Sequence, residues 1–169
     1  PIMSGDGIYS IMLYILIYLF MNLGAFFVVI TIKNKTKGES FEDYKGLGWE
    51  MPIVGAVMTL FMVSLTGLPP TAGFVGKFYI FASLINGGES FYWLVFAGGI
   101  NSVISLYYYL RVVKVMYFEG DRKETILRPS NAITGMLLVT AIPTLLLGVY
   151  WSPVANWIEK SLVFFIQTI

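Results

Sequence analysis

The 169-residue sequence contains no cysteine and no histidine. These side chains are the usual protein ligands of iron–sulfur clusters, haem iron and structural zinc, so no metal or cluster site of these kinds is predicted. Without cysteine, the redox compartment cannot be inferred from disulfide usage either. We therefore expect any electron transfer connected with this protein to take place in another chain.

Charge is also scarce. Asp, Glu, Lys and Arg make up 12% of the residues, against about 25% in a typical soluble domain. A net charge of +1 gives no indication of nucleic-acid binding. Hydrophobic residues instead make up 57% of the chain, and the mean hydropathy is +0.75. This composition indicates an integral membrane protein whose main surroundings are the lipid bilayer.

The first seven residues have no basic residue and do not begin with Met. They therefore lack the charged start of a signal peptide. We expect this sequence to belong to a longer chain, or to lack its first residues.

Long apolar runs predict four membrane-spanning segments and a helical tail. The segments cover residues 8–32, 51–85, 91–118 and 132–151. In the tail, Ser152 is a plausible N-cap for a helix over residues 153–168, whose apolar side chains recur at helical spacing. We expect that helix to be interfacial or loosely packed. The sequence thus predicts one all-α, polytopic helix bundle, and it shows no convincing internal repeat.

The second segment is too long for one crossing and too short for two. As one helix, its residues would extend about 52 Å, against about 30 Å of hydrocarbon. Pro69 and Pro70 lack backbone donors and interrupt a helix. Gly67 and Gly73 flank them. The sequence predicts one discontinuous helix, unwound over residues 67–73.

Lysine and arginine are distributed unevenly between the loops. Nine of the eleven basic residues lie in residues 33–50 and 111–130, whereas residues 86–90 contain none. The positive-inside rule therefore predicts that loops 33–50 and 119–131 are cytoplasmic and that the C-terminus lies outside.

Lys77 is the only charged residue of the segment 51–85. A cation at this depth costs roughly 2.5–3.5 kcal/mol on insertion scales and usually marks an ion pathway. Because a buried lysine can release and regain its proton, Lys77 is the candidate proton carrier. The alternative is a lysine that reaches the nearer membrane surface along its flexible stem.

Other polar residues have two interpretations each. Ser64, Thr66 and Thr71 flank the predicted break; their hydroxyls could line a wet path or could satisfy freed backbone groups. Asn22 could belong to a relay, but amides beside small residues more often join helices. Tyr107 to Arg111 fits an interfacial aromatic belt. No phosphate-binding glycine loop or nucleophile triad is present.

Residues 67–79 read Gly-Leu-Pro-Pro-Thr-Ala-Gly-Phe-Val-Gly-Lys-Phe-Tyr. This string resembles part of the antiporter-like subunits of respiratory complex I, the proton-translocating NADH:quinone oxidoreductase. Residues 18–26, 42–47 and 106–111 also agree with that family, in the same order. Gly-Lys-Phe-Tyr and Tyr-Tyr-Tyr-Leu-Arg point to subunit N. The Pro-Pro-Thr-Ala-Gly-Phe string alone also suits multisubunit cation/proton antiporters.

This resemblance implies the last four helices of a fourteen-helix subunit in the bacterial cytoplasmic membrane. It implies redox-driven proton translocation, with Lys77 as the one member of the proton path that this chain supplies. FMN, iron–sulfur clusters and quinone would be bound by other subunits, and the partners would be other membrane subunits of the complex. Two alternatives stay open: a cation/proton antiporter subunit, and a structural subunit in which Lys77 forms a static ion pair.

Overall fold

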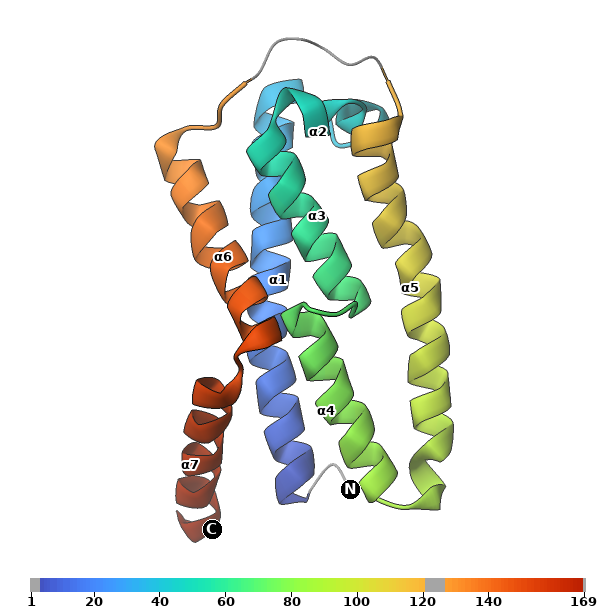
Figure 1. The fold of residues 1–169 in the computed structure, drawn as a ribbon, viewed down its shortest axis with the longest axis vertical. Coiled ribbons are helices and arrows are strands. Elements are labelled where there is room, and N and C mark those ends of the chain that lie inside the picture. Colours follow the sequence, from blue (N-terminus) through green and yellow to red (C-terminus); the bar gives the residue numbers. More distant parts are fainter. Residues whose placement is uncertain (1–3, 121–126, 169) are drawn as a thin grey trace.

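The computed structural model describes residues 4–120 and 127–168, with side chains up to Leu162. Throughout this part of the chain the structure consists of helices and connections, without a strand (Figure 1). The predicted all-α class is therefore confirmed. In chain order the elements are α1 (Gly5–Thr36), η1 (Phe41–Tyr44), α2 (Leu47–Glu50), α3 (Pro52–Thr66), α4 (Ala72–Asn86), η2 (Glu89–Phe91), α5 (Tyr92–Phe118), α6 (Asn131–Val149) and α7 (Ser152–Thr168).

Three helical segments in the described residues are long and apolar enough to cross a membrane: α1, Glu89–Phe118 and α6. The number becomes four if Phe41–Glu50 and Pro52–Thr66, which meet at 117°, are counted as one bent segment. Helix α4 is a shorter apolar helix. A membrane helix bundle is thereby confirmed, while the count of four crossings stays a prediction.

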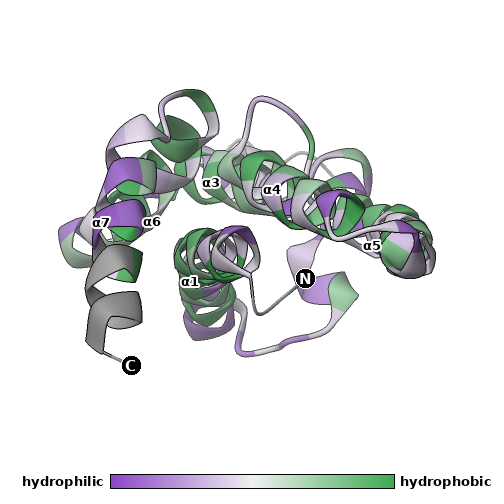
Figure 2. Cartoon of the chain, turned by 90° about the horizontal axis from the view of Figure 1, so that it is seen from below, coloured by the Kyte–Doolittle hydropathy of each residue, from purple (hydrophilic) through white to green (hydrophobic). Residues whose placement is uncertain are grey.

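The bundle has two layers when viewed from below (Figure 2). Helices α6, α3 with α4, and α5 form a row, and α1 packs against one face of that row. The buried side of α1 explains this central position. Its residues Leu13, Ile17, Met21, Val28 and Ile32 are at most 1% exposed. They follow each other at intervals of four or seven residues, which places them on one stripe of the helix.

Helix α5, by contrast, is bound to the bundle along a narrow strip. Only Ser105, Val115 and Met116 are buried among its residues. Large apolar side chains such as Trp93, Phe96 and Val103 are 66–71% exposed. Apolar side chains facing outward are the normal surface of a helix in lipid, since no water has to be excluded there.

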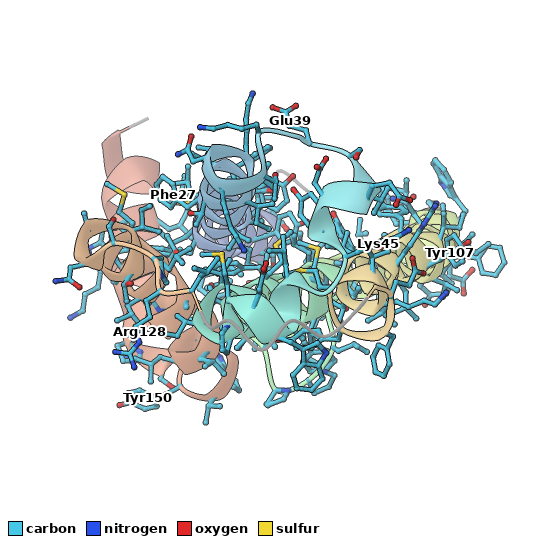
Figure 3. All side chains as sticks on the ribbon, turned by 90° about the horizontal axis from the view of Figure 1, so that it is seen from above. Phe27, Glu39, Lys45, Tyr107, Arg128 and Tyr150 are labelled. Atoms are coloured by element: carbon cyan, nitrogen blue, oxygen red, sulfur yellow. The ribbon has the colours of Figure 1, made fainter. Side chains whose placement is uncertain are left out.

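Charged groups gather at the end of the bundle where α1 finishes, which we call the Lys33 end (Figure 3). Lys33 pairs with Glu39, and Lys35 pairs with the nearly buried Glu50. Arg111 of α5 lies over the Phe41 ring, with its guanidinium carbon 4.7 Å from the centroid. The loop after α1 is thus fixed to the bundle. Arg122 and Lys123, which contributed to the orientation prediction, lie outside the described residues.

Helices α6 and α7 follow one another along α1 (Figure 1). Helix α6 continues through Pro143 and ends at Val149, beside the connection between α3 and α4. Helix α7 begins at Ser152, one residue before the predicted start. It runs lengthwise rather than across the end of the bundle, and its Ile158 and Leu162 are buried. Phe165 and Ile169, part of the predicted apolar face, lie outside the described side chains.

Gly148 permits the close approach of α6 to this connection. A Cβ atom at Gly148 would collide with the backbone of Pro70, Thr71 and Ala72, which cannot move aside as a flexible side chain can. The same addition at Gly135, in the same helix, would meet no atom within 4 Å. Only one of these two glycines is therefore required by packing.

We predict that Gly148→Ala destabilises the protein by about 1–3 kcal/mol, the usual cost of overpacking. Gly135→Ala is the matched control and should be neutral or slightly stabilising, because alanine favours a helix over glycine. The measurement is the thermal unfolding midpoint of the purified complex that contains each variant. Equal midpoints for the two variants would contradict this account of α6 packing.

Candidate functional site

The connection between α3 and α4 is a short break whose own donors are all used. Helix α3 ends at Thr66, and Gly67 takes the left-handed conformation with φ 86°. The N–H groups of Gly67 and Leu68 donate to Ser64 and Val63, the arrangement of a Schellman motif. Thr71 N–H donates to Leu68, and Pro69 and Pro70 have no N–H to satisfy. Backbone that is not helical needs all of its donors paired when it lies at membrane depth.

Two carbonyl groups at the end of α3 have a different partner. Lys77 of α4 donates from Nζ to the carbonyl oxygens of Thr66 and Leu65, at 2.9 and 3.1 Å. A third hydrogen bond runs from Nζ to Ser102 Oγ on α5, at 3.3 Å. An ammonium has three N–H donors, so these acceptors match it in number. The charge also lies at the negative end of the α3 dipole, which favours a cation.

The start of α4 is satisfied by Ser64. Gly73 N–H donates to Ser64 Oγ at 3.0 Å, and that hydroxyl lies 2.8 Å from the sulfur of Met21. Helix α4 begins at Ala72, so Gly73, predicted in the unwound part, is helical instead. The reason is that Thr71 is extended and precedes the helix as its N-cap residue. A Cβ at Gly73 would collide with the Ser64 carbonyl, so this position needs glycine for contact rather than for φ.

The hydroxyls predicted to flank the break all contact backbone groups. Thr66 Oγ1 donates to Val63 and Thr71 Oγ1 donates to Leu68, both at 2.6 Å. Together with the Ser64 contact, this geometry is that of backbone satisfaction.

A cavity of about 340 Å³ opens beside Lys77, between α1, α4 and α5. Its polar lining consists of the Lys77 ammonium together with Tyr14, Tyr18, Asn101, Ser102, Ser105, Tyr108 and Tyr109. Lys77 is half-buried, because it lines this cavity. The side chain points back to the break instead of reaching toward the far end of α4.

Asn22 is not brought to Lys77. It lines a second cavity of about 330 Å³ nearer the Lys33 end, with Phe41 and Met58 among the other lining residues. Leu65, Tyr108 and Tyr109 line both cavities, so the two adjoin there. Tyr107 points away from the bundle and is 73% exposed (Figure 3).

Sequence reasoning missed Ser102, the one side chain among those described that hydrogen-bonds to the Lys77 ammonium. A signal was present, since Ser102, Ser105 and Tyr109 recur at spacings of three and four residues. That spacing places them on one face of α5. The long apolar composition of this segment concealed the polar stripe.

These features define a class of protein: a membrane helix bundle in which a lysine bonds to the end of a broken helix beside a polar cavity. The comparison with family models is more specific. Residues 2–105 match the model described as NADH:quinone oxidoreductase/Mrp antiporter, transmembrane. The chain belongs to this family.

Individual relatives indicate which subunit of this family the chain resembles. The chain is 48% identical over 164 residues to NADH-quinone oxidoreductase subunit N 2 of Sorangium cellulosum, covering 95% of this chain and 32% of that protein. It is 39% identical to subunit N of Anaeromyxobacter sp., covering 96% and 33% respectively. The predicted resemblance to subunit N is confirmed. The chain spans about a third of the length of these relatives.

A solved structure shares the fold. It is that of the membrane-bound sulfane sulfur reductase, an archaeal respiratory membrane complex. The TM-score is 0.72 at 28% identity, and the match covers 86% of this chain and 24% of the other. Similar helix bundles thus occur in membrane complexes of respiration.

We predict that Ser64→Ala destabilises the break, because it leaves the buried Gly73 N–H without its acceptor. The expected cost is about 1–3 kcal/mol. Ser83→Ala is the control on α4, since the Ser83 hydroxyl donates to Ile80 within its own helix. Thermal unfolding of the purified complex measures both. A Ser64→Ala midpoint equal to that of Ser83→Ala would show that the Gly73 contact contributes nothing.

Proposed function

We propose that this chain is part of a proton-translocating membrane subunit of an NADH–quinone oxidoreductase, and that Lys77 is its proton carrier. The assignment to a proton-translocating membrane subunit is supported by family membership and by relatives named as subunit N. The carrier role of Lys77 is supported by one observation: its Nζ binds the Leu65 and Thr66 carbonyls beside a polar cavity.

The groups that accept hydrogen bonds from Lys77 support a proton carrier rather than a static charge. Four ion pairs are present in the described residues, and none of them includes Lys77. Within residues 4–120 and 127–162, the groups that hold the ammonium are neutral oxygens and the α3 dipole. Neutral acceptors bind a cation less strongly than a carboxylate does. The proton can therefore leave when another charge approaches or when water in the cavity accepts it.

The helix arrangement supports a mid-membrane position for this exchange. Helices α3 and α4 have 15 residues each, about 22 Å, so neither alone crosses about 30 Å of hydrocarbon. They follow one another along the bundle (Figure 1). We propose that they form one discontinuous crossing, the second along the chain and the one that brings the number to four, with Lys77 near its centre.

The charge distribution supports an orientation in a bacterial cytoplasmic membrane. Lys33, Lys35 and Lys45 lie at the same end of the bundle as Arg128. The positive-inside rule places that end in the cytoplasm, and the C-terminus then lies outside.

Oxidation and reduction belong to other subunits of the assembly. The chain has no cysteine or histidine that could hold a cluster. FMN, iron–sulfur clusters and quinone would be bound elsewhere, and the immediate partners would be other membrane subunits. The role of this chain is to position the lysine, to pair the backbone groups between α3 and α4, and to admit water beside the lysine.

We predict that Lys77→Ala complexes assemble and oxidise NADH but lose proton translocation in whole or in part. The measurement is the number of protons moved per NADH in reconstituted vesicles. Lys160→Ala removes an exposed lysine of α7 and is the matched control. Full stoichiometry in Lys77→Ala would refute the carrier assignment.

Lys77→Arg separates the structural role of the charge from proton exchange. Arginine keeps a cation and N–H donors for the Leu65 and Thr66 carbonyls but does not deprotonate in proteins. We predict that Lys77→Arg approaches wild-type thermal stability while pumping no better than Lys77→Ala. Restored pumping in the arginine variant would favour a static charge at this position.

A further inference from the structure

Ser102 is the only partner of the Lys77 ammonium in the described residues that can reverse its hydrogen bond. The Leu65 and Thr66 carbonyls can only accept, whereas a serine hydroxyl both accepts and donates. We propose that Ser102 is the proton-transfer partner of Lys77, through which the proton enters and leaves the cavity. This inference rests on the proposed function.

Hydrogen-bond accounting distinguishes the two protonation states. The charged form donates to two carbonyls and to Ser102 Oγ, which uses all three N–H groups. The neutral amine has two N–H groups and one lone pair. Its N–H groups continue to serve the two carbonyls, and the lone pair then requires a donor. Ser102, at 3.3 Å, is the group that supplies one.

The hydroxyl of Ser102 is also free to act in this way. Ser105, one turn further along α5, donates its hydroxyl to the Ser102 carbonyl at 2.8 Å. The structure records no such bond from the Ser102 hydroxyl to any described residue. Both serines line the Lys77 cavity, but only Ser102 contacts the ammonium. Its hydroxyl hydrogen can therefore be given to a water in the cavity.

The proton balance of the step is simple. The Lys77 ammonium gives a proton to Ser102 Oγ as the Ser102 hydroxyl gives its own proton to a cavity water. The products are a neutral amine, an unchanged serine hydroxyl and a protonated water. The new Ser102 hydroxyl already donates to the amine, because the proton that it received lay between Nζ and Oγ. The cavity, at about 340 Å³, is far larger than the roughly 30 Å³ that one water occupies in the liquid.

The test compares Ser102→Ala, Ser102→Thr and Ser105→Ala in the assembled complex, with Lys77→Ala alongside. We expect Ser102→Ala to slow NADH-driven proton translocation about tenfold or more, since positioned proton-transfer groups contribute about 10²- to 10⁴-fold. Ser102→Thr keeps the hydroxyl and should restore translocation. Ser105→Ala should lose far less than Ser102→Ala. Proton uptake by vesicles and its pH dependence are the readouts, with thermal unfolding measured on each variant.

The outcomes separate the two proposals. Equal translocation in Ser102→Ala and wild type overturns the role of Ser102, and a loss in Lys77→Ala then leaves the carrier intact. Full translocation in Lys77→Ala overturns the carrier itself. Equal losses in Ser102→Ala and Ser102→Thr also overturn the inference, because the hydroxyl is then not what matters. If Ser102→Ala does not assemble, Ser102→Val against Ser102→Thr decides, since that pair differs only by methyl for hydroxyl.

Discussion

The site depends on one requirement: backbone carbonyls at the end of α3 need donors where water is scarce. An unpaired polar group in hydrocarbon costs several kcal/mol. Lys77 meets this requirement for Leu65 and Thr66. The ammonium in turn needs acceptors, because a cation without them is expensive at that depth. The break and the charge therefore stabilise each other, and neither is explained by itself.

This mutual dependence is compatible with a change of protonation. A neutral lysine amine still has two N–H groups, which is the number of carbonyls that α3 presents. After loss of a proton, the amine can thus still donate to both carbonyls, and only its hydrogen bond with Ser102 has to change. On the other side of the break, Gly148 lets α6 approach the Pro70 backbone closely. The break is packed against α6 on this side, while the lysine that binds the end of α3 lines the cavity on the other.

The sequence predicted the break because its signals are local. Pro69, Pro70 and the excess length of the apolar segment are all contained in a few consecutive residues. The spacing of Ser102 and Ser105 was visible in the sequence, but the contact with Lys77 was not, because it depends on how α5 lies across the junction of two other helices. Asn22 illustrates the same limit, since its position in α1 was plain but the cavity that it faces depends on α3 and α5. Gly73 was assigned to the unwound part because composition does not reveal where Thr71 begins the next helix.

Lysine suits this position better than either arginine or a lysine paired with a carboxylate. Arginine would keep its proton throughout, so it could satisfy the break but carry nothing. A carboxylate beside the ammonium would add the attraction of an opposite charge to the hydrogen bond and would favour the protonated lysine. Two carbonyls, one hydroxyl and a helix dipole are an intermediate environment. The proposed carrier role needs this balance: binding strong enough to keep a charged lysine at the break, and weak enough to let its proton leave.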